Sequence, residues 1–285
     1  MSYQHLDFTI EQVEKIMVRA GEIAVERALD TYALSIVDPM TLKDGLGKEE
    51  RCADLIDHMI RSDEGLGWSG RTEYRYNGDS FQWCGAFAAY CQPFIALELR
   101  RLYWASTDRL NAYLQHKPLF GTKNERAVMA RFPKRHQEEF ERETGKRWTP
   151  SYARIYGTFD QDSINGSVLM RAGDIGLFGP AWARSNFRPF GQHVTVFKGY
   201  EIRGRQWFCD LYEGNATGEI PGRPETVKHP VQGVIHMKRP IGLHDGQSLD
   251  DYHLRRWGRW SFFDIDLDLF EEYSGGFLSQ LVSEG

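Results

Sequence analysis

The sequence predicts an α+β protein, because segments with helical periodicity come first and segments with strand periodicity follow. Up to about residue 103, apolar residues recur at spacings of three and four, which is typical of helices packed on a core. After Val168, short runs alternate apolar and polar residues between glycine-containing turns, which is typical of antiparallel strands. This order predicts N-terminal helices packed on a central antiparallel sheet.

Three helices are expected in the first part of the chain. Thr9 and Gln12 form a capping-box pattern, which marks the start of the first helix. Pro93 predicts a kink or an early end in the third helix, because its ring removes a backbone donor. The three expected helices cover residues 9 to about 29, 48–61 and about 83–103.

The second part of the chain predicts a four-stranded sheet after an insertion. Residues 105–165 are charged, partly helical in pattern and without strand signals, so we interpret them as an insertion. Residues 1–240 then form one domain, and 241–285 a C-terminal extension packed on it, in which Asp264–Asp268 is expected as a half-buried edge strand. The expected strands are Gly173–Gly179, His193–Glu201, Gln206–Asn215 and Val231–Arg239.

Composition excludes several classes of protein. The chain has 285 residues, 41% hydrophobic and 26% charged, which is ordinary for a globular protein. The net charge of −5 argues against a nucleic-acid partner. No run of 18 apolar residues occurs, so no membrane insertion is expected. The first residues lack a basic segment followed by an apolar run, so we expect synthesis in the cytoplasm without a signal peptide.

The four cysteines argue against a zinc site and against disulfides. Their spacings contain no pair of two-residue-spaced cysteines, and the histidines show no metal-ligand spacing, so no metal or cofactor is expected. Cys84 and Cys91 are separated by about 10 Å of rise on one helix, too far for a disulfide. We interpret Cys52, Cys91 and Cys209 as structural core residues.

Cys84 in "FQWCGAF" has the features of a nucleophile. It lies where a glycine-rich loop meets an apolar helix, and a helix N-terminus favours the thiolate. Gly85 and Ala86 leave the sulfur approachable, and the Cys84 N–H can donate to an oxyanion. Gln82 and Asn77 are the candidate oxyanion side chains. The alternative is a buried structural thiol, which is the usual role of a cysteine in an apolar helix.

A base and an orienting group are available in the strand region. His193 begins a strand, which places its imidazole at the rim of the sheet, facing the helix that carries Cys84. Glu213 and Asn215 end the next strand two residues apart, so both face the same side of an extended segment. Either could orient the imidazole, so the third member of the site stays open between them.

Four motifs in this order, "WCGAF", "RAGDIGLF", "GQHVTVF" and "YEGN", resemble the papain-like peptidoglycan amidase and peptidase group. That group includes CHAP domains and NlpC-type hydrolases, and the Glu-x-Asn spacing is most like CHAP. The resemblance implies a papain-like catalytic domain in residues 1–240. It further implies Cys84 as nucleophile, His193 as general base and acid, Glu213 or Asn215 as third member, and Asp174 as a structural residue.

The function that this resemblance implies is hydrolysis of an amide bond in peptidoglycan, by an N-acetylmuramoyl-L-alanine amidase or an endopeptidase. The substrate would be the stem peptide or its amide link. Such an enzyme must reach the bacterial cell wall or periplasm, so a phage endolysin or a secreted antibacterial effector with an immunity protein is expected. The alternatives are a papain-like protease, deamidase or transglutaminase-like toxin acting on protein, and an inactive binding module on the same scaffold.

Overall fold

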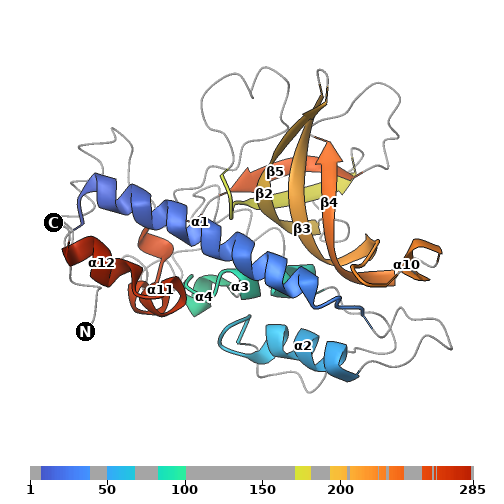
Figure 1. The fold of residues 1–285 in the computed structure, drawn as a ribbon, viewed down its shortest axis with the longest axis horizontal. Helices are drawn as coiled ribbons and strands as arrows, with labels where there is room; N and C mark the ends of the chain where they lie inside the picture. The colour runs from blue at the N-terminus through green and yellow to red at the C-terminus, as the bar shows by residue number, and fades with distance from the viewer. Residues whose placement is uncertain are drawn as a thin grey trace, which may run out of the picture.

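The computed structural model describes eleven parts of the chain, and its class is α+β as the sequence predicts (Figure 1). The described residues are 8–38, 50–67, 83–100, 171–180, 193–203, 206–223, 225–228, 231–240, 252–258, 260 and 262–283. The helices are α1 (Ile10–Ala33), α2 (Glu50–Arg61), α3 (Cys84–Cys91), α4 (Leu97–Arg100), α10 (Glu225–Lys228), η3 (Phe262–Asp264), α11 (Leu267–Ser274) and α12 (Phe277–Ser283). The strands are β1 (Ile175–Pro180), β2 (His193–Arg203), β3 (Gln206–Gly218), β4 (Val231–Pro240) and β5 (Tyr252–Gly258).

The strands form one five-stranded antiparallel sheet in the order β4-β3-β2-β1-β5 (Figure 1). The four strands expected from the sequence are confirmed, and β2 and β3 form a hairpin, closed by the Arg203 and Gln206 pair. The fifth strand is a difference. No strand was expected at residues 252–258, but β5 pairs with β1 and forms one edge of the sheet. Its sequence, with two adjacent arginines, carries no clear apolar alternation that would have predicted it.

Helix α1 begins as the capping box predicts. The Thr9 side chain accepts the Gln12 N–H at 3.2 Å, and the Gln12 side chain accepts the Thr9 N–H at 2.9 Å. The helix continues to Ala33, four residues past the expected end. Its inward face is buried from Ile16 to Ala28, and the buried apolar residues at helical spacing are Ile16, Ala20, Ile23, Ala24 and Ala28.

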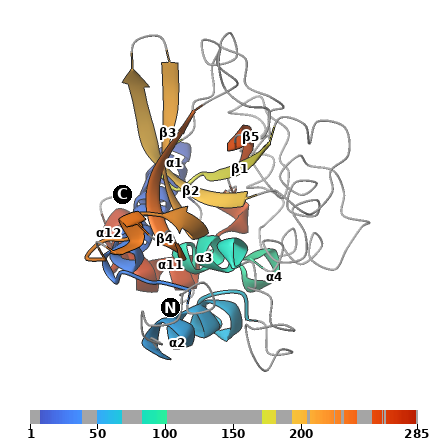
Figure 2. The same ribbon diagram turned by 90° about the vertical axis from the view of Figure 1, so that its right-hand side faces the viewer.

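Helix α3 is the central helix of the molecule. It packs against β2 and β3 on one side and against α1 and α2 on others, so seven of its eight residues are buried (Figures 1 and 2). A helix apolar on all sides is expected to be buried in this way. The chain leaves the helix at Gln92, just before Pro93, and a separate short helix α4 follows. The expected continuous helix to residue 103 is therefore wrong, and the early end is confirmed.

The C-terminal segment packs on the N-terminal helix. Helices α11 and α12 lie beside the start of α1, and the Gln12 side chain donates to the Leu281 carbonyl at 3.4 Å (Figure 1). The expected edge strand at Asp264–Asp268 is wrong. Asp266 instead caps α11 by accepting the Leu269 N–H, and Leu267 and Phe270 point into the core.

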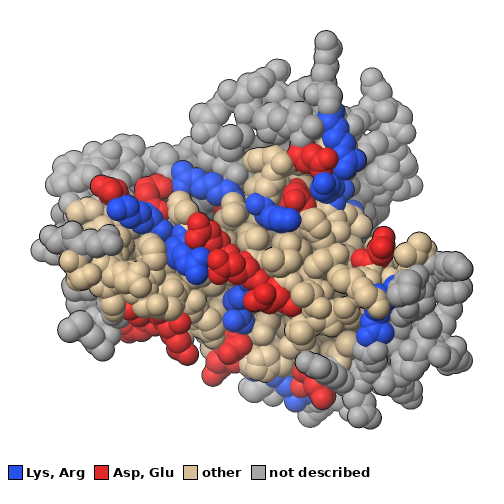
Figure 3. Space-filling view, viewed as in Figure 1, with Lys and Arg blue, Asp and Glu red and all other residues tan. Residues whose placement is uncertain are grey.

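The outward side of α1 carries a band of mixed charges (Figure 3). Lys15 pairs with Glu11, and Arg19 pairs with both Glu22 and Glu26, all with partly exposed side chains. Exposed pairs of this kind contribute at most about 1 kcal/mol each. In the part of the chain that the structure describes, no helix combines the length and hydropathy needed to cross a bilayer.

Candidate active site

Cys84 is the first residue of α3, and Trp83 is the residue that caps the helix. The first backbone bond of the helix runs from the Phe87 N–H to the Trp83 carbonyl at 3.0 Å. The N–H groups before Phe87 therefore have no acceptor within the helix and point toward its N-terminal end. The Cys84 residue is 8% exposed, so its thiol lies at this end with little contact with solvent.

The start of α3 is fixed by a buried hydrogen bond. The indole Nε1 of Trp83 donates to Oδ2 of Asp38 at 3.1 Å, and both residues are completely buried. Asp38 is itself tied to the sheet, because its N–H donates to the Gln232 carbonyl in β4 at 2.7 Å. This chain of bonds fixes the position of Cys84 relative to the sheet.

A glycine lets β3 approach α3 closely. A Cβ at Gly214 would lie 2.4 Å from Cβ of Phe87 and 2.9 Å from Cζ3 of Trp83. No side chain larger than hydrogen fits at these distances, because real Cβ contacts are longer. Gly214 therefore allows the strand that carries Glu213 to lie against the helix that carries Cys84.

The Cys84 thiol lies against the start of β2. The His193 imidazole and the backbone of Val194 and Gly85 lie close enough to the Cys84 sulfur to lower the pKa of its thiol. These groups stabilise a negative sulfur. The structure thus brings together the cysteine and histidine that the sequence singled out.

Glu213 lies on the other side of the imidazole. Its Oε2 is 3.1 Å from Nε2 of His193, within ion-pair distance, although the N–H is not aimed at the oxygen as a hydrogen bond requires. The Glu213 side chain is completely buried and that of His193 is 12% exposed. Because Nε2 faces the carboxylate, Nδ1 is left as the ring nitrogen for the thiol.

Arg239 of β4 holds the same carboxylate. Its Nε donates to Oε1 of Glu213 at 2.5 Å and its Nη2 donates to Oε2 at 2.7 Å. Burial by itself raises the pKa of Glu213. The charge of His193 and the hydrogen bonds from Arg239 outweigh burial and lower the pKa to about 2. Glu213 is therefore ionised throughout the physiological range.

The electrostatics favour a thiolate and imidazolium pair. Burial lowers the pKa of His193, but the charge of Glu213 and the neighbouring Cys84 raise it well above its usual range. Burial raises the pKa of Cys84, but the nearby His193, through its charge, and the backbone of Val194 and Gly85 bring it below its ordinary value. A proton is thus favoured on the imidazole over the sulfur.

Asn215 lies at an irregular point of β3. The pairing of β3 with β4 shifts between Glu213 and Ala216, which makes a bulge, and Asn215 has a left-handed φ of 56°. Its side-chain oxygen is buried and has no hydrogen-bond partner among the described residues. No contact with His193 is present for Asn215, so the geometry favours Glu213 as the third member.

The remaining sequence predictions have mixed outcomes. Cys52, Cys91 and Cys209 are buried thiols that form no disulfide, as expected for core residues, and burial raises the pKa of Cys91 and Cys209. Asp174 is 2% exposed, and its carboxylate accepts the Arg171 N–H at 2.7 Å, a structural role. The oxyanion candidates Gln82 and Asn77 and the insertion at 105–165 lie outside the described residues.

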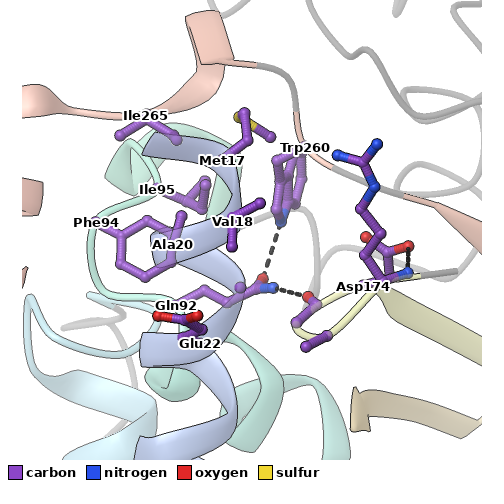
Figure 4. A pocket seen from close by; sticks show the side chains of 14 residues that line it. Met17, Val18, Ala20, Glu22, Gln92, Phe94, Ile95, Asp174, Trp260 and Ile265 are labelled. Carbon is purple, nitrogen blue, oxygen red and sulfur yellow. Dashed lines mark hydrogen bonds between the residues drawn. The ribbon is translucent and has the colours of Figure 1, made fainter. Parts of the chain in front are cut away.

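A cavity at the other end of α3 is separate from this site (Figure 4). Its volume is about 160 Å³ and none of the residues around Cys84 lines it. The Gln92 side chain crosses it, donating to the Gly173 carbonyl at 2.6 Å and accepting from Nε1 of Trp260 at 2.9 Å. Ligand pockets are in general larger, about 300 Å³ or more, so we do not assign substrate to this cavity.

Within the described ranges, no group of three or more histidine, cysteine, aspartate or glutamate side chains is arranged to hold a metal ion. The side chains of the described site are a thiol, an imidazole, a carboxylate and a guanidinium.

Comparison of the chain with models of protein families, with curated proteins and with solved structures found no match. The site geometry and the sequence motifs are therefore the basis of the functional proposal.

Proposed function

We propose that this chain is a papain-like cysteine hydrolase that cleaves an amide bond of peptidoglycan. The observation that carries the proposal is the contact series from Cys84 to His193 to Glu213, assembled from α3, β2 and β3. A nucleophile, a base and a group that orients the base are the three parts that acyl transfer by a thiol needs. The order of the four motifs, which resembles CHAP and NlpC-type hydrolases, supports peptidoglycan as the substrate.

In the first half-reaction, the Cys84 thiolate attacks the amide carbonyl carbon and the carbonyl electrons move onto oxygen. The Cys84 N–H at the start of α3 is a candidate donor to this oxyanion. When the tetrahedral intermediate collapses, the carbon–nitrogen bond breaks and the imidazolium of His193 gives its proton to the leaving amine. A thioester on Cys84 remains.

In the second half-reaction, His193 accepts a proton from water as the water attacks the thioester carbon. The carbon–sulfur bond then breaks, the thiolate re-forms and the carboxylic acid leaves. Glu213 stays ionised in both halves, so it stabilises His193 whenever the ring is protonated. The cellular setting, a phage lytic enzyme or a secreted antibacterial effector with an immunity protein, follows from the choice of substrate.

The test is digestion of purified peptidoglycan sacculi by wild type, Cys84→Ala and Cys91→Ala, with soluble products identified by mass spectrometry. Cys91→Ala is a matched control, because it removes a buried thiol from the same helix at its far end. We expect fragments from wild type and Cys91→Ala and none from Cys84→Ala. The fragment masses distinguish an amidase from an endopeptidase.

If wild type shows enhanced reactivity of Cys84 but releases no fragments, peptidoglycan is not the substrate. Denatured and native protein substrates would then test the same chemistry on protein, as a protease or deamidase. A wild-type Cys84 that also shows no enhanced reactivity would indicate a binding module on this scaffold.

A further inference from the structure

Arg239 makes the strongest contact of the buried carboxylate, and nothing in the motif pattern assigns it a role. Its two bonds to Glu213 measure 2.5 and 2.7 Å, against 3.1 Å for the approach of His193 to the same side chain. The Glu213 side chain is completely buried and that of Arg239 is 18% exposed. A bidentate pair of an arginine with a buried carboxylate has a more fixed geometry than a surface ion pair, and breaking it costs more stability.

The guanidinium is directed at this carboxylate by its surroundings. Arg239 pairs in register with Cys209, four residues before Glu213 on β3, so its side chain extends back along the face of the sheet. The guanidinium carbon lies 5.7 Å from the ring centre of Phe178, whose backbone pairs with that of His193. Arginine packed on an aromatic ring and on a carboxylate loses much of its freedom to move away.

Arg239 and His193 share one oxygen of the carboxylate. Oε2 of Glu213 accepts from Nη2 of Arg239 and is also the atom nearest Nε2 of His193. In a buried carboxyl and imidazole pair the proton can reside on either partner, because burial disfavours both charges. A guanidinium does not release its proton, so its presence disfavours a protonated Glu213 in particular.

The charged and titratable groups around this carboxylate come from three elements. Among the described residues, β2 presents His193, β4 presents Arg239, and Cys84 of α3 reaches the far side of the imidazole, while β1 presents the apolar Phe178. The groups that compete for the proton of the site are therefore Cys84, His193 and Glu213, beside one permanent cation.

We propose that Arg239 is a positioning residue of this site, which holds Glu213 as a fixed, ionised carboxylate and so keeps the proton of the Cys84–His193 pair on the imidazole. The proposal rests on the proposed cysteine chemistry and acts through Glu213 alone. It makes the functional unit four side chains from four elements, α3, β2, β3 and β4.

The experiment is the pH profile of Cys84 alkylation by iodoacetamide in the full chain, followed by mass spectrometry of the labelled peptide. With Arg239→Gln, we expect the acid limb to move up by about one pH unit and labelling at pH 6 to slow about tenfold. Arg239→Lys keeps the positive charge but cannot make the bidentate bond to Glu213, so its acid limb should lie between those of wild type and Arg239→Gln. An unchanged acid limb in Arg239→Gln would overturn the proposal.

The matched control is Arg27→Gln. Arg27 is 20% exposed and pairs with Glu64 at 3.3 Å, close to the burial and partner type of Arg239, but it contacts none of the residues around Cys84. Its profile should coincide with wild type. If Arg27→Gln moves the limb as far as Arg239→Gln does, the effect is a general loss of stability and the proposal fails.

A double variant tests whether Arg239 acts through Glu213. It removes both charges of the buried ion pair, so it leaves no unpaired buried charge and is more favourable for folding than either single variant. The acid limb of Arg239→Gln with Glu213→Gln should coincide with that of Glu213→Gln alone. If the acid limb of the double variant is instead displaced from that of Glu213→Gln by about one further pH unit, Arg239 does not act through Glu213. This comparison remains decisive if Arg239→Gln alone fails to fold. Alkylation needs no substrate turnover, so a displaced limb in a protein that releases no peptidoglycan fragments would overturn only the substrate.

Discussion

Oε2 of Glu213 lies 3.1 Å from Nε2 of His193, and the Glu213 side chain has no exposure to solvent. A carboxylate in this position can fix the ring so that its other nitrogen faces Cys84. It also stabilises the positive charge that the ring carries when the sulfur is a thiolate.

Glu213→Gln should lower the rate of hydrolysis by about 10²- to 10⁴-fold, since the amide keeps the shape but loses the charge. Without that charge the pKa of His193 falls and the thiolate is less favoured. The measurement is kcat/KM on soluble peptidoglycan fragments, with circular dichroism to establish folding. A Glu213→Gln enzyme within threefold of wild type would contradict the assignment of Glu213.

Asn215→Gly should retain activity within about tenfold, because glycine adopts the left-handed φ of 56° without strain. This variant separates the backbone role of Asn215 from a role of its amide. The same kcat/KM assay applies. If kcat/KM falls as far in Asn215→Gly as in Glu213→Gln, the Asn215 amide is the orienting group and the geometric preference for Glu213 is wrong.

The stability of the protein should depend on pH through the same pair. Glu213 has its pKa lowered from 4.5 to about 2, so its contribution is present above pH 4.5 and is lost as the pH falls toward 2. His193 has its pKa raised from 6.5 to about 10, so its contribution is present below pH 6.5 and is lost as the pH rises through 10. The contribution is therefore largest between about pH 4.5 and 6.5.

Urea unfolding of wild type and Glu213→Gln across pH 3 to 9 measures this contribution. We expect the difference in free energy of unfolding to peak at about 2 kcal/mol near pH 5.5 and to decline on both sides. A difference that is constant with pH would mean that the pair carries no charge in the folded protein.

Gly214→Ala should lose about 1–3 kcal/mol of stability and most of the activity, because the new methyl group meets Phe87 and Trp83. Displacing β3 from α3 moves Glu213 and His193 away from Cys84. Gly199→Ala on β2 is the matched control, since a Cβ there meets nothing within 4 Å. Equal losses for the two variants would refute the close approach at Gly214.

The residues that local signals mark were predictable from the sequence. Cys84 follows a glycine-rich loop at the start of an apolar helix, His193 opens an alternating strand, and Glu213 ends the next one. Each signal depends on a few neighbouring residues, and the α+β order places the three elements together. The choice between Glu213 and Asn215 needed the structure, because the bulge after Glu213 changes which way the following residues point.

Arg239 could not be predicted from the sequence. Its strand was expected, but the contact with Glu213 spans four positions of register and depends on the twist of the sheet. The segment at Asp264–Asp268 was misjudged for a different reason. In α11, Asp266 caps the helix and Leu267 and Phe270, three residues apart, are buried. Over so short a segment this pattern cannot be distinguished from the alternation of a strand.

Selective alkylation of the native protein at pH 6 tests the central claim most directly, namely that Cys84 is an activated thiolate held by His193. Brief iodoacetamide treatment, with all four cysteines followed by mass spectrometry, should label Cys84 first and at least about tenfold faster than a free thiol compound. His193→Ala should abolish that advantage. A wild-type Cys84 that reacts no faster than the free thiol, or no faster than the buried Cys91 and Cys209, would contradict the account.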